Sequence, residues 1–173
     1  MSSLVQRTKA PAEDNRYYYA DNPFYFSGVG MPNCTAYAWG RFYEATNQYP
    51  NLSLDDAENW YLKSDGYERG TEPKIGAIIC WSKGNVWNSA DGAGHVAFVE
   101  RVFADGSILT SESGYNDSRF WWTKRRYSQY NWGGMDYTFQ GFIYSPIEFT
   151  NTVMPGRIPL IMILSKKRWN GGL

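Results

Sequence analysis

The sequence predicts one α+β domain, in which helices come first and an antiparallel sheet follows. Three observations support this fold class. Apolar residues recur at helical spacing between residues 33 and 62, whereas short apolar segments alternate with turn-rich segments between residues 75 and 144. The dipeptide Asp105-Gly106, which lies between two of these apolar segments, is a strong signal for a β-hairpin. Helices followed by consecutive antiparallel strands are typical of an α+β domain.

Two helices are expected in the first part of the chain. The first covers residues 34–47, with Asn33 as its N-cap, because an Asn side chain can accept a hydrogen bond from the first turn. Pro32 disfavours an earlier start. The second helix covers residues 54–62 and is capped by Ser53.

Four later segments have the length and apolar character of strands, namely residues 75–81, 95–103, 107–113 and 139–144. The second and third of them form the predicted hairpin. If its turn has two residues, His95 lies opposite Asn116, and Glu112 lies roughly 13 Å further along the ladder. A β-bulge or a longer loop would bring Glu112 closer.

The composition indicates a folded protein that does not bind nucleic acid through its overall charge. The chain has 173 residues, enough for one domain with a substantial core. Its 17 Lys and Arg residues balance 17 Asp and Glu residues. Aromatic residues make up 18% of the chain, which is too many for a disordered protein. No apolar run is long enough to span a membrane.

The distribution of apolar residues suggests where the domain begins and ends. We expect the folded domain over residues 16–146, a loose polar lead-in over residues 1–15, and a tail or linker over residues 147–173. The first ten residues contain no apolar segment, so no signal peptide is expected.

One histidine and two cysteines define the candidate chemistry. One histidine excludes a His-rich metal site, and two cysteines with one histidine fall short of the four ligands of a structural zinc site unless carboxylates contribute, so no metal or cofactor is predicted. Cys80 lies within an apolar strand and is expected in the core. Cys34 opens the first helix, where backbone N–H groups and the helix dipole stabilise a thiolate. A purely structural Cys34 and a Cys34–Cys80 disulfide are the alternatives.

A thiol at a helix start and an imidazole at a strand start together describe the nucleophile and base of a Cys–His hydrolase. His95 is the only unperturbed base near neutral pH. It would take the proton of Cys34 and later give it to the leaving amine. A third side chain should orient the imidazole. The expected register favours Asn116 for this role and leaves Glu112 open.

Several segments resemble the motifs of CHAP domains, the cysteine, histidine-dependent amidohydrolases/peptidases. Residues 33–41 (NCTAYAWGR) resemble the nucleophile motif, and residues 94–100 (GHVAFVE) resemble the histidine motif. Residues 73–81 are similar to the strand that precedes the histidine motif, and residues 111–113 are similar to the acidic motif after the hairpin. The matches follow the family's order and cover about residues 16–146.

The resemblance implies a papain-like (NlpC/P60-like) fold, with N-terminal helices packed on an antiparallel sheet, and hydrolysis of peptidoglycan. By position, Cys34 is the nucleophile, His95 the base and Glu112 the residue that orients His95. The family often has an Asn two positions after this acid, where the chain has Gly114, so Asn116 is the candidate replacement. The bond cut would be the N-acetylmuramoyl-L-alanine amide or a bond within the stem or cross-bridge peptides.

Trp121 and Trp122 are expected to line the cleft, because aromatic rings suit sugar and apolar peptide surfaces; the alternative is a place in the core. The basic residues 124–126 are expected to form a solvated turn, or else to contact anionic wall polymers. We expect a phage endolysin that is made in the host cytoplasm and acts on the cell wall after release. Its partner would be a separate cell-wall-binding domain or subunit. The rival functions are a non-catalytic wall-binding module and a structural phage tail component.

Overall fold

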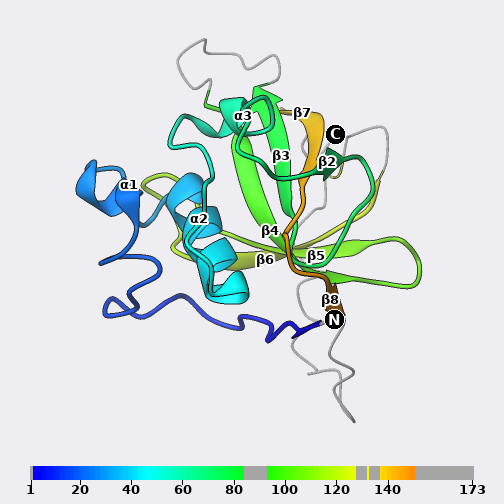
Figure 1. The fold of residues 1–173 in the computed structure, drawn as a ribbon, viewed down its shortest axis with the longest axis horizontal. Coiled ribbons are helices and arrows are strands. Elements are labelled where there is room, and N and C mark those ends of the chain that lie inside the picture. Colours follow the sequence, from blue (N-terminus) through cyan, green and yellow to red (C-terminus); the bar gives the residue numbers. More distant parts are fainter. Residues whose placement is uncertain (1, 84–92, 128–131, 133–136, 151–173) are drawn as a thin grey trace, which may run out of the picture.

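The computed structural model describes residues 2–83, 93–127, 132 and 137–150, and Figure 1 shows their fold. The described helices are α1 (Pro23–Phe26), α2 (Cys34–Thr46) and α3 (Ala57–Trp60). The described strands are β1 (Ser2–Ser3), β2 (Arg69–Gly70), β3 (Ile78–Lys83), β4 (His95–Val102), β5 (Ile108–Glu112), β6 (Trp121–Arg125), β7 (Tyr137–Ile143) and β8 (Phe149–Thr150).

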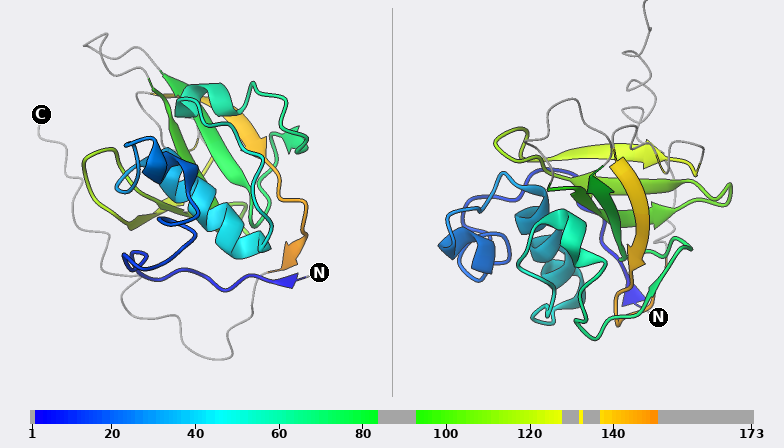
Figure 2. Two further views of the ribbon diagram at one scale, coloured as in Figure 1. Left: turned by 60° about the vertical axis from the view of Figure 1, so that its left-hand side comes forward. Right: turned by 90° about the horizontal axis from the view of Figure 1, so that it is seen from above.

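Strands β2 to β7 form one antiparallel sheet in the order β2-β7-β3-β4-β5-β6. Strands β3 to β6 are neighbours in chain order, and β7 returns to pair with the other edge of β3. Helix α2 packs on this sheet mainly through β4 (Figure 2). The structure therefore confirms the predicted α+β class and its antiparallel sheet.

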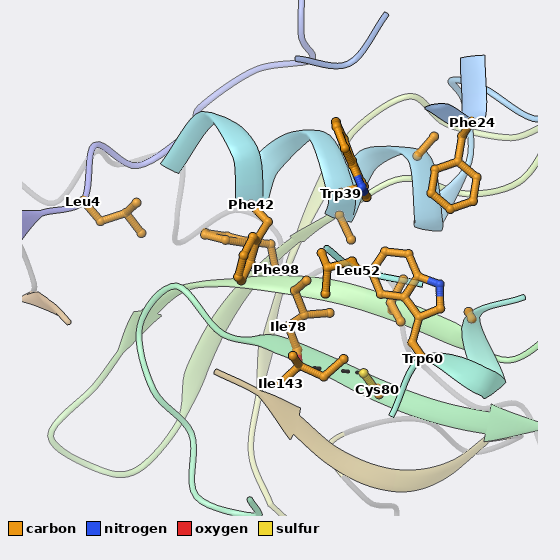
Figure 3. Packing of buried hydrophobic residues seen from close by; sticks show 14 residues of the cluster. Leu4, Phe24, Trp39, Phe42, Leu52, Trp60, Ile78, Cys80, Phe98 and Ile143 are labelled. Atoms are coloured by element: carbon orange, nitrogen blue, oxygen red, sulfur yellow. Dashed lines mark hydrogen bonds between the residues drawn. The ribbon is translucent and has the colours of Figure 1, made fainter. Parts of the chain in front are cut away.

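The main core lies between α2 and one face of the sheet. Phe42 of α2 lies beside Phe98 and close to Ile78 in Figure 3, and Trp39 and Ile143 belong to the same cluster; each of these side chains is at most 1% exposed. Burying a side chain of this size contributes about 1.5–3 kcal/mol, so this contact is the main attachment of the helix. The opposite face carries a second buried cluster, formed by Ala77, Ile79, Trp81, Ala97, Val99, Ile108, Trp132, Phe142 and Tyr144.

The first predicted helix is confirmed, whereas the second is much shorter than expected. The α3 helix contains four residues and begins after Asp56, whose side chain makes no capping hydrogen bond. Leu54 and Leu62, which were expected within the helix, are 60% and 74% exposed. Trp60 is fully buried instead, and its indole N–H donates to the Asp55 carbonyl at 3.0 Å. One anchoring Trp therefore replaces the longer apolar stripe.

The turn between β4 and β5 differs from the expected two-residue turn. Phe103 N donates to the Ser107 carbonyl at 2.8 Å, so three residues, 104–106, form the loop. Gly106 has a φ of 75° and supplies the left-handed position that such a loop requires. The expectation of a two-residue turn is wrong.

A β-bulge in β4 changes the register of the same hairpin again. Val99 pairs with Thr110, whereas Arg101 pairs with Leu109, so Glu100 is an extra residue in β4. A bulge of this kind leaves one residue without a partner in the ladder and increases the local twist. Together, the longer turn and the bulge move the β4–β5 ladder by two residues from its expected register.

The first residues of the chain are packed against the domain rather than loose. Strand β1 pairs in parallel with β8, and Leu4 is 5% exposed within the main core. Arg7 forms an ion pair with Glu44 of α2. Residues 2–15 therefore contribute to the fold, while the expected domain limits at residues 16 and 146 stay predictions. Of the expected tail, residues 151–173 lie outside the described residues.

None of the helices in the described part of the chain has the length and apolar character needed to cross a membrane.

Candidate active site

Cys34 is the first residue of α2, and the cap before it sets its position. Asn33 Oδ1 accepts hydrogen bonds from Thr35 N at 3.0 Å and from the Thr35 hydroxyl at 2.9 Å, while Asn33 Nδ2 donates to the Val29 carbonyl at 2.9 Å. The Cys34 thiol is partly exposed at the positive end of the helix dipole. Both cysteines are free, so the disulfide alternative is wrong. Cys80 is fully buried, as predicted, and burial raises the pKa of its thiol.

His95 is the first residue of β4, and Gly94 fixes the path of the chain just before it. Gly94 has a φ of 69°, which favours glycine. A Cβ atom at this position would lie 2.4 Å from the Trp81 carbonyl oxygen and 2.8 Å from the backbone nitrogen of Glu58. Only glycine therefore lets the start of β4 lie this close to β3 and α3.

Aromatic rings surround the imidazole of His95. The ring of Trp81 stacks on it with centroids 5.7 Å apart, and the ring of Trp121 lies nearly parallel to it, at 6.5 Å and an interplanar angle of 10°. The ring of Tyr137 lies 6.2 Å away in a tilted orientation. These contacts restrict the imidazole and leave its side chain 18% exposed.

The imidazole joins the Cys34 thiol to a buried carboxylate. His95 Nε2 lies 2.8 Å from Glu112 Oε2, and the side chain of Glu112 is 1% exposed. Because the carboxylate is an acceptor, Nε2 is the donor in this pair. The imidazole also hydrogen-bonds the side chain of Cys34, for which Nδ1 remains. The order Cys34, His95, Glu112 is the arrangement of a nucleophile, a base and an orienting group.

The charges of the three groups depend on one another. Burial by itself lowers the pKa of His95, but its hydrogen bonds to Cys34 and Glu112 outweigh this effect and raise the pKa to about 9. Burial by itself raises the pKa of Glu112, but the charge of Arg125 and the interaction with His95 lower it to about 2. At neutral pH the site therefore favours an imidazolium next to an ionised carboxylate.

The site lies in a groove of about 1050 Å³ that is lined by Cys34, His95, Glu112 and Trp121. Helix α2 and the loops before α3 and after β5 also line this groove. Asp55, Asp56 and Asp117 are among these residues. The groove is large enough to hold an extended segment of a substrate across the thiol.

The structure does not bring Asn116 to His95. The shifted β4–β5 ladder, continued toward its end, places His95 beside Gly114 and diagonal to Glu112, which a long side chain can reach. Asn116 lies on an exposed loop with a φ of 51°, and its backbone N–H donates to the Pro32 carbonyl at 3.3 Å. The register expectation that favoured Asn116 is therefore wrong, and Glu112 makes the contact.

The two tryptophans expected in the cleft lie on opposite faces of β6. Trp121 lines the groove, whereas the indole N–H of Trp122 donates to the Arg7 carbonyl at 3.0 Å. Successive side chains of a strand point to opposite faces, so two neighbouring residues of β6 do not both enter one groove. The expectation for Trp122 is therefore wrong, and this residue holds the N-terminal segment on the sheet.

Sequence reasoning also missed the role of Arg125, which was expected in a solvated turn. It is the last residue of β6, and its side chain is 10% exposed. Arg125 Nη2 donates to both oxygens of Glu112, each at 2.8 Å. The alternation of β6 could have indicated this position, because Arg125 and Trp121 are an even number of residues apart.

Among the residues that the structure describes, no group of three or more His, Cys, Asp or Glu side chains is placed to hold a metal ion.

Comparison with known proteins identifies the family to which this site belongs. The model of the CHAP domain matches residues 24–114, which include Cys34, His95 and Glu112. The chain belongs to the CHAP domain family.

Several relatives have names or solved structures. The chain is 37% identical over 84 residues to "Probable autolysin SsaALP" of Staphylococcus aureus (strain NCTC 8325 / PS 47), which covers 47% of the chain and 29% of the relative. It is 32% identical over 117 residues to "Staphylococcal secretory antigen SsaA" of the same strain, which covers 64% of the chain and 40% of the relative. The chain therefore spans less than half the length of these curated relatives.

A similar solved structure is that of an N-acetylmuramoyl-L-alanine amidase from Staphylococcus aureus. It has a TM-score of 0.42 and 28% sequence identity, and the match covers 56% of this chain and 29% of that one.

Proposed function

We propose that this protein hydrolyses an amide bond of bacterial peptidoglycan by Cys–His nucleophilic catalysis. The observation that carries the proposal is the series Cys34, His95 and Glu112 within one open groove. The family assignment and the relative named as an autolysin support peptidoglycan as the substrate. We also propose that the fold is of the papain-like (NlpC/P60-like) type, since a helix with the thiol packs on a sheet with the imidazole.

Each residue has a role that follows from its contacts. The thiolate of Cys34 attacks the carbonyl carbon of the scissile amide, and a tetrahedral oxyanion forms. Backbone N–H groups at the start of α2, beginning with that of Cys34, stabilise this oxyanion. The imidazolium of His95 gives its proton to the leaving amine, which leaves a thioester on Cys34.

A water molecule then hydrolyses the thioester, and the imidazole of His95 takes up the proton of that water. Glu112 keeps the imidazole in the tautomer and orientation that both steps need. Trp121 supplies a ring surface on the groove wall for a sugar or an apolar part of the peptide. The bond cut is either the N-acetylmuramoyl-L-alanine amide or a bond of the stem or cross-bridge peptides.

The decisive experiment compares wall lysis by the wild type and by Cys34→Ala. Loss of turbidity of purified cell walls should fall to the uncatalysed rate in the variant, because no nucleophile remains. The matched control is Cys80→Ala, which removes the other thiol from the core and should keep lytic activity while it folds. Lysis by Cys34→Ala at the wild-type rate would contradict the proposal.

The products then decide which bond is cut. Mass spectrometry of released fragments should show either N-acetylmuramic acid without its peptide, for an amidase, or new peptide N-termini with the sugar–peptide bond intact, for an endopeptidase. Binding to walls without new ends would support the rival function of a non-catalytic wall-binding module. Neither binding nor cleavage would favour a structural phage tail component.

The cellular setting stays a prediction. An endolysin made in the host cytoplasm should be found in the cytoplasmic fraction of infected cells before lysis and on the walls afterwards. Recovery of the protein from the walls of uninfected cells would contradict this setting.

A further inference from the structure

Arg125 binds the same carboxylate that orients the catalytic imidazole. Its Nη2 donates to both oxygens of Glu112 at 2.8 Å, while His95 Nε2 contacts Oε2 at 2.8 Å. The hydroxyl of Thr110 lies 2.9 Å from Oε1. The carboxylate of Glu112 is therefore held from several directions at once.

Arg125 is itself fixed by contacts on its other atoms. Its Nε donates to the Thr110 hydroxyl at 3.1 Å, and its Nη1 donates to the Trp132 carbonyl at 3.1 Å. The guanidinium lies 4.8 Å from the ring centroid of Trp81, and that ring also stacks on the imidazole of His95. These contacts fix the orientation of the planar guanidinium, and its N–H groups in turn restrict the orientation of the Glu112 carboxylate.

A buried carboxylate without a cation tends to take up a proton. Glu112 is 1% exposed, so little water is available to stabilise its charge. If it were protonated, it could no longer stabilise an imidazolium at His95. The pairing with Arg125 removes this tendency because it compensates the buried charge.

We propose that Arg125 is a positioning residue of the hydrolytic reaction, which keeps Glu112 charged and aligned so that His95 stays directed at Cys34. This proposal rests on the proposed function. Arg125 also lines the groove, but its hydrogen bonds go to Glu112, to the Thr110 hydroxyl and to the Trp132 carbonyl, so in this proposal it acts on the reaction through Glu112.

The electrostatic consequence can be measured. Burial raises the pKa of Glu112, and the charge of Arg125 is the largest of the effects that lower it. Among the described residues, the other titratable groups that line this groove are Cys34 from α2, Tyr137 from β7, Tyr115 and Asp117 from the loop after β5, and Asp55 and Asp56 from the segment before α3. None of these is a cation, so without Arg125 only the imidazolium of His95 would compensate the carboxylate, and the pKa of Glu112 should rise.

The test uses the fact that His95 is the single histidine of the chain. Its ring signals in an NMR titration of the untagged full chain therefore need no assignment, and their acid inflection reports protonation of Glu112. In the wild type this inflection should lie near the Glu112 pKa of about 2. Arg125→Met should move it upward by more than about one pH unit. The same inflection in both proteins would overturn the proposal.

Arg126→Met is the matched control. Arg126 is the next residue, its side chain is 66% exposed, and it pairs with Asp105 rather than with Glu112. The Arg126→Met substitution changes the net charge by the same amount as Arg125→Met. An equal shift of the His95 acid inflection in the Arg126→Met variant would therefore show a general charge effect and would also overturn the proposal.

Wall lysis gives a second readout. Arg125→Met should lower kcat at pH 7 by about 10- to 100-fold and move the acid limb of the pH profile upward, whereas loss of folded protein would leave the shape of the profile unchanged. Arg125→Lys keeps the charge, so the acid limb of its pH profile should return to the wild-type position, and its kcat should lie between those of the wild type and Arg125→Met. If Arg125→Met does not fold, a Lys variant with wild-type kcat and wild-type acid limb would overturn the proposal.

The two readouts separate this proposal from the proposed function. The NMR titration needs no substrate, so it tests the link between Arg125 and Glu112 even in a protein that does not cut walls. A wild type without wall activity would refute the proposed function alone. Normal activity with an unmoved inflection would refute the role of Arg125 alone.

Discussion

At the scale of single residues, the site combines two opposite charges that burial would otherwise disfavour. The unfavourable burial of His95 is offset by its hydrogen bonds to Cys34 and Glu112, and that of Glu112 by the charge of Arg125 and the interaction with His95, so each pKa moves in the direction that favours the charged form. The contact is possible because Glu112 has a side chain long enough to reach diagonally across the hairpin. Asn116 is a plausible partner by residue type, yet it lies on the loop beyond the strand.

The raised pKa of His95 predicts how stability depends on pH. The pKa of His95 is raised from an ordinary value of 6.5 to about 9 in the folded protein. The protonated imidazole therefore stabilises the folded state fully below about pH 6.5, and this stabilisation is lost as the pH rises through 9. The free energy of unfolding, measured with urea between pH 6 and pH 10, should fall by about 3 kcal/mol from this group. His95→Gln should lose most of this dependence. An equally steep fall in that variant would assign the effect to other groups.

At the scale of elements, short irregular segments determine the positions of the site residues relative to one another. The turn of three residues and the bulge at Glu100 set which residue of β5 lies near His95. Helix α3 has only four residues, but its contact with Gly94 limits the path of the chain into β4. The long helix α2 supplies the thiol, and these small features bring the sheet residues to it.

Gly94 is therefore expected to be essential at this position. Gly94→Ala would place a Cβ atom 2.4 Å from the Trp81 carbonyl oxygen, so the start of β4 must move and His95 moves with it. We expect a lower melting temperature and a loss of wall lysis of about 100-fold.

Gly106→Ala is the control for backbone strain. Gly106 has a φ of 75°, close to that of Gly94, but no atom lies within 4 Å of the added Cβ. It should cost about 1–2 kcal/mol of stability and keep its activity after correction for folded protein. Equal activity losses in the two variants would show that strain, rather than the clash, affects the site.

At the scale of the whole molecule, a buried ion pair joins the helix to the sheet. Arg41 of α2 donates through Nε and Nη2 to the two oxygens of Glu100, both at 2.8 Å, and these side chains are 3% and 0% exposed. Ser111 of β5 donates to the same carboxylate at 2.7 Å. Since Glu100 is the bulge residue, the pair holds the hairpin register and the helix together.

Removal of one partner should therefore affect both stability and the site. Arg41→Met leaves the Glu100 carboxylate buried without its cation, which should lower the free energy of unfolding by about 3–5 kcal/mol. Urea denaturation measures this loss, and the NMR signals of His95 should shift in the fraction that remains folded. Arg119→Met, which removes an exposed arginine that pairs with Glu13, should leave the urea midpoint unchanged. Similar midpoints for both variants would contradict the role of Arg41.

Much of the fold and the core of the site could be predicted from the sequence. The cap at Asn33, the helix with Cys34 at its start, and the strand that begins at His95 all follow from local rules about capping and apolar spacing. These rules depend on residues close together in the chain. They therefore determined the fold class and the pairing of a thiol with a single imidazole, and the family motifs added Glu112.

The tertiary structure alone decided which residues surround that pair. The register that selects Glu112 over Asn116 depends on a bulge whose extra residue is held by Arg41, more than fifty positions earlier in the chain. The hydrogen bond of Trp122 to the Arg7 carbonyl likewise joins segments that lie far apart in sequence, whereas the contact of Arg125 with Glu112 joins the neighbouring strands β5 and β6. Such contacts depend on the compensation of buried charges and on the fit of side chains from several elements. Patterns among residues that are close in sequence do not determine these contacts.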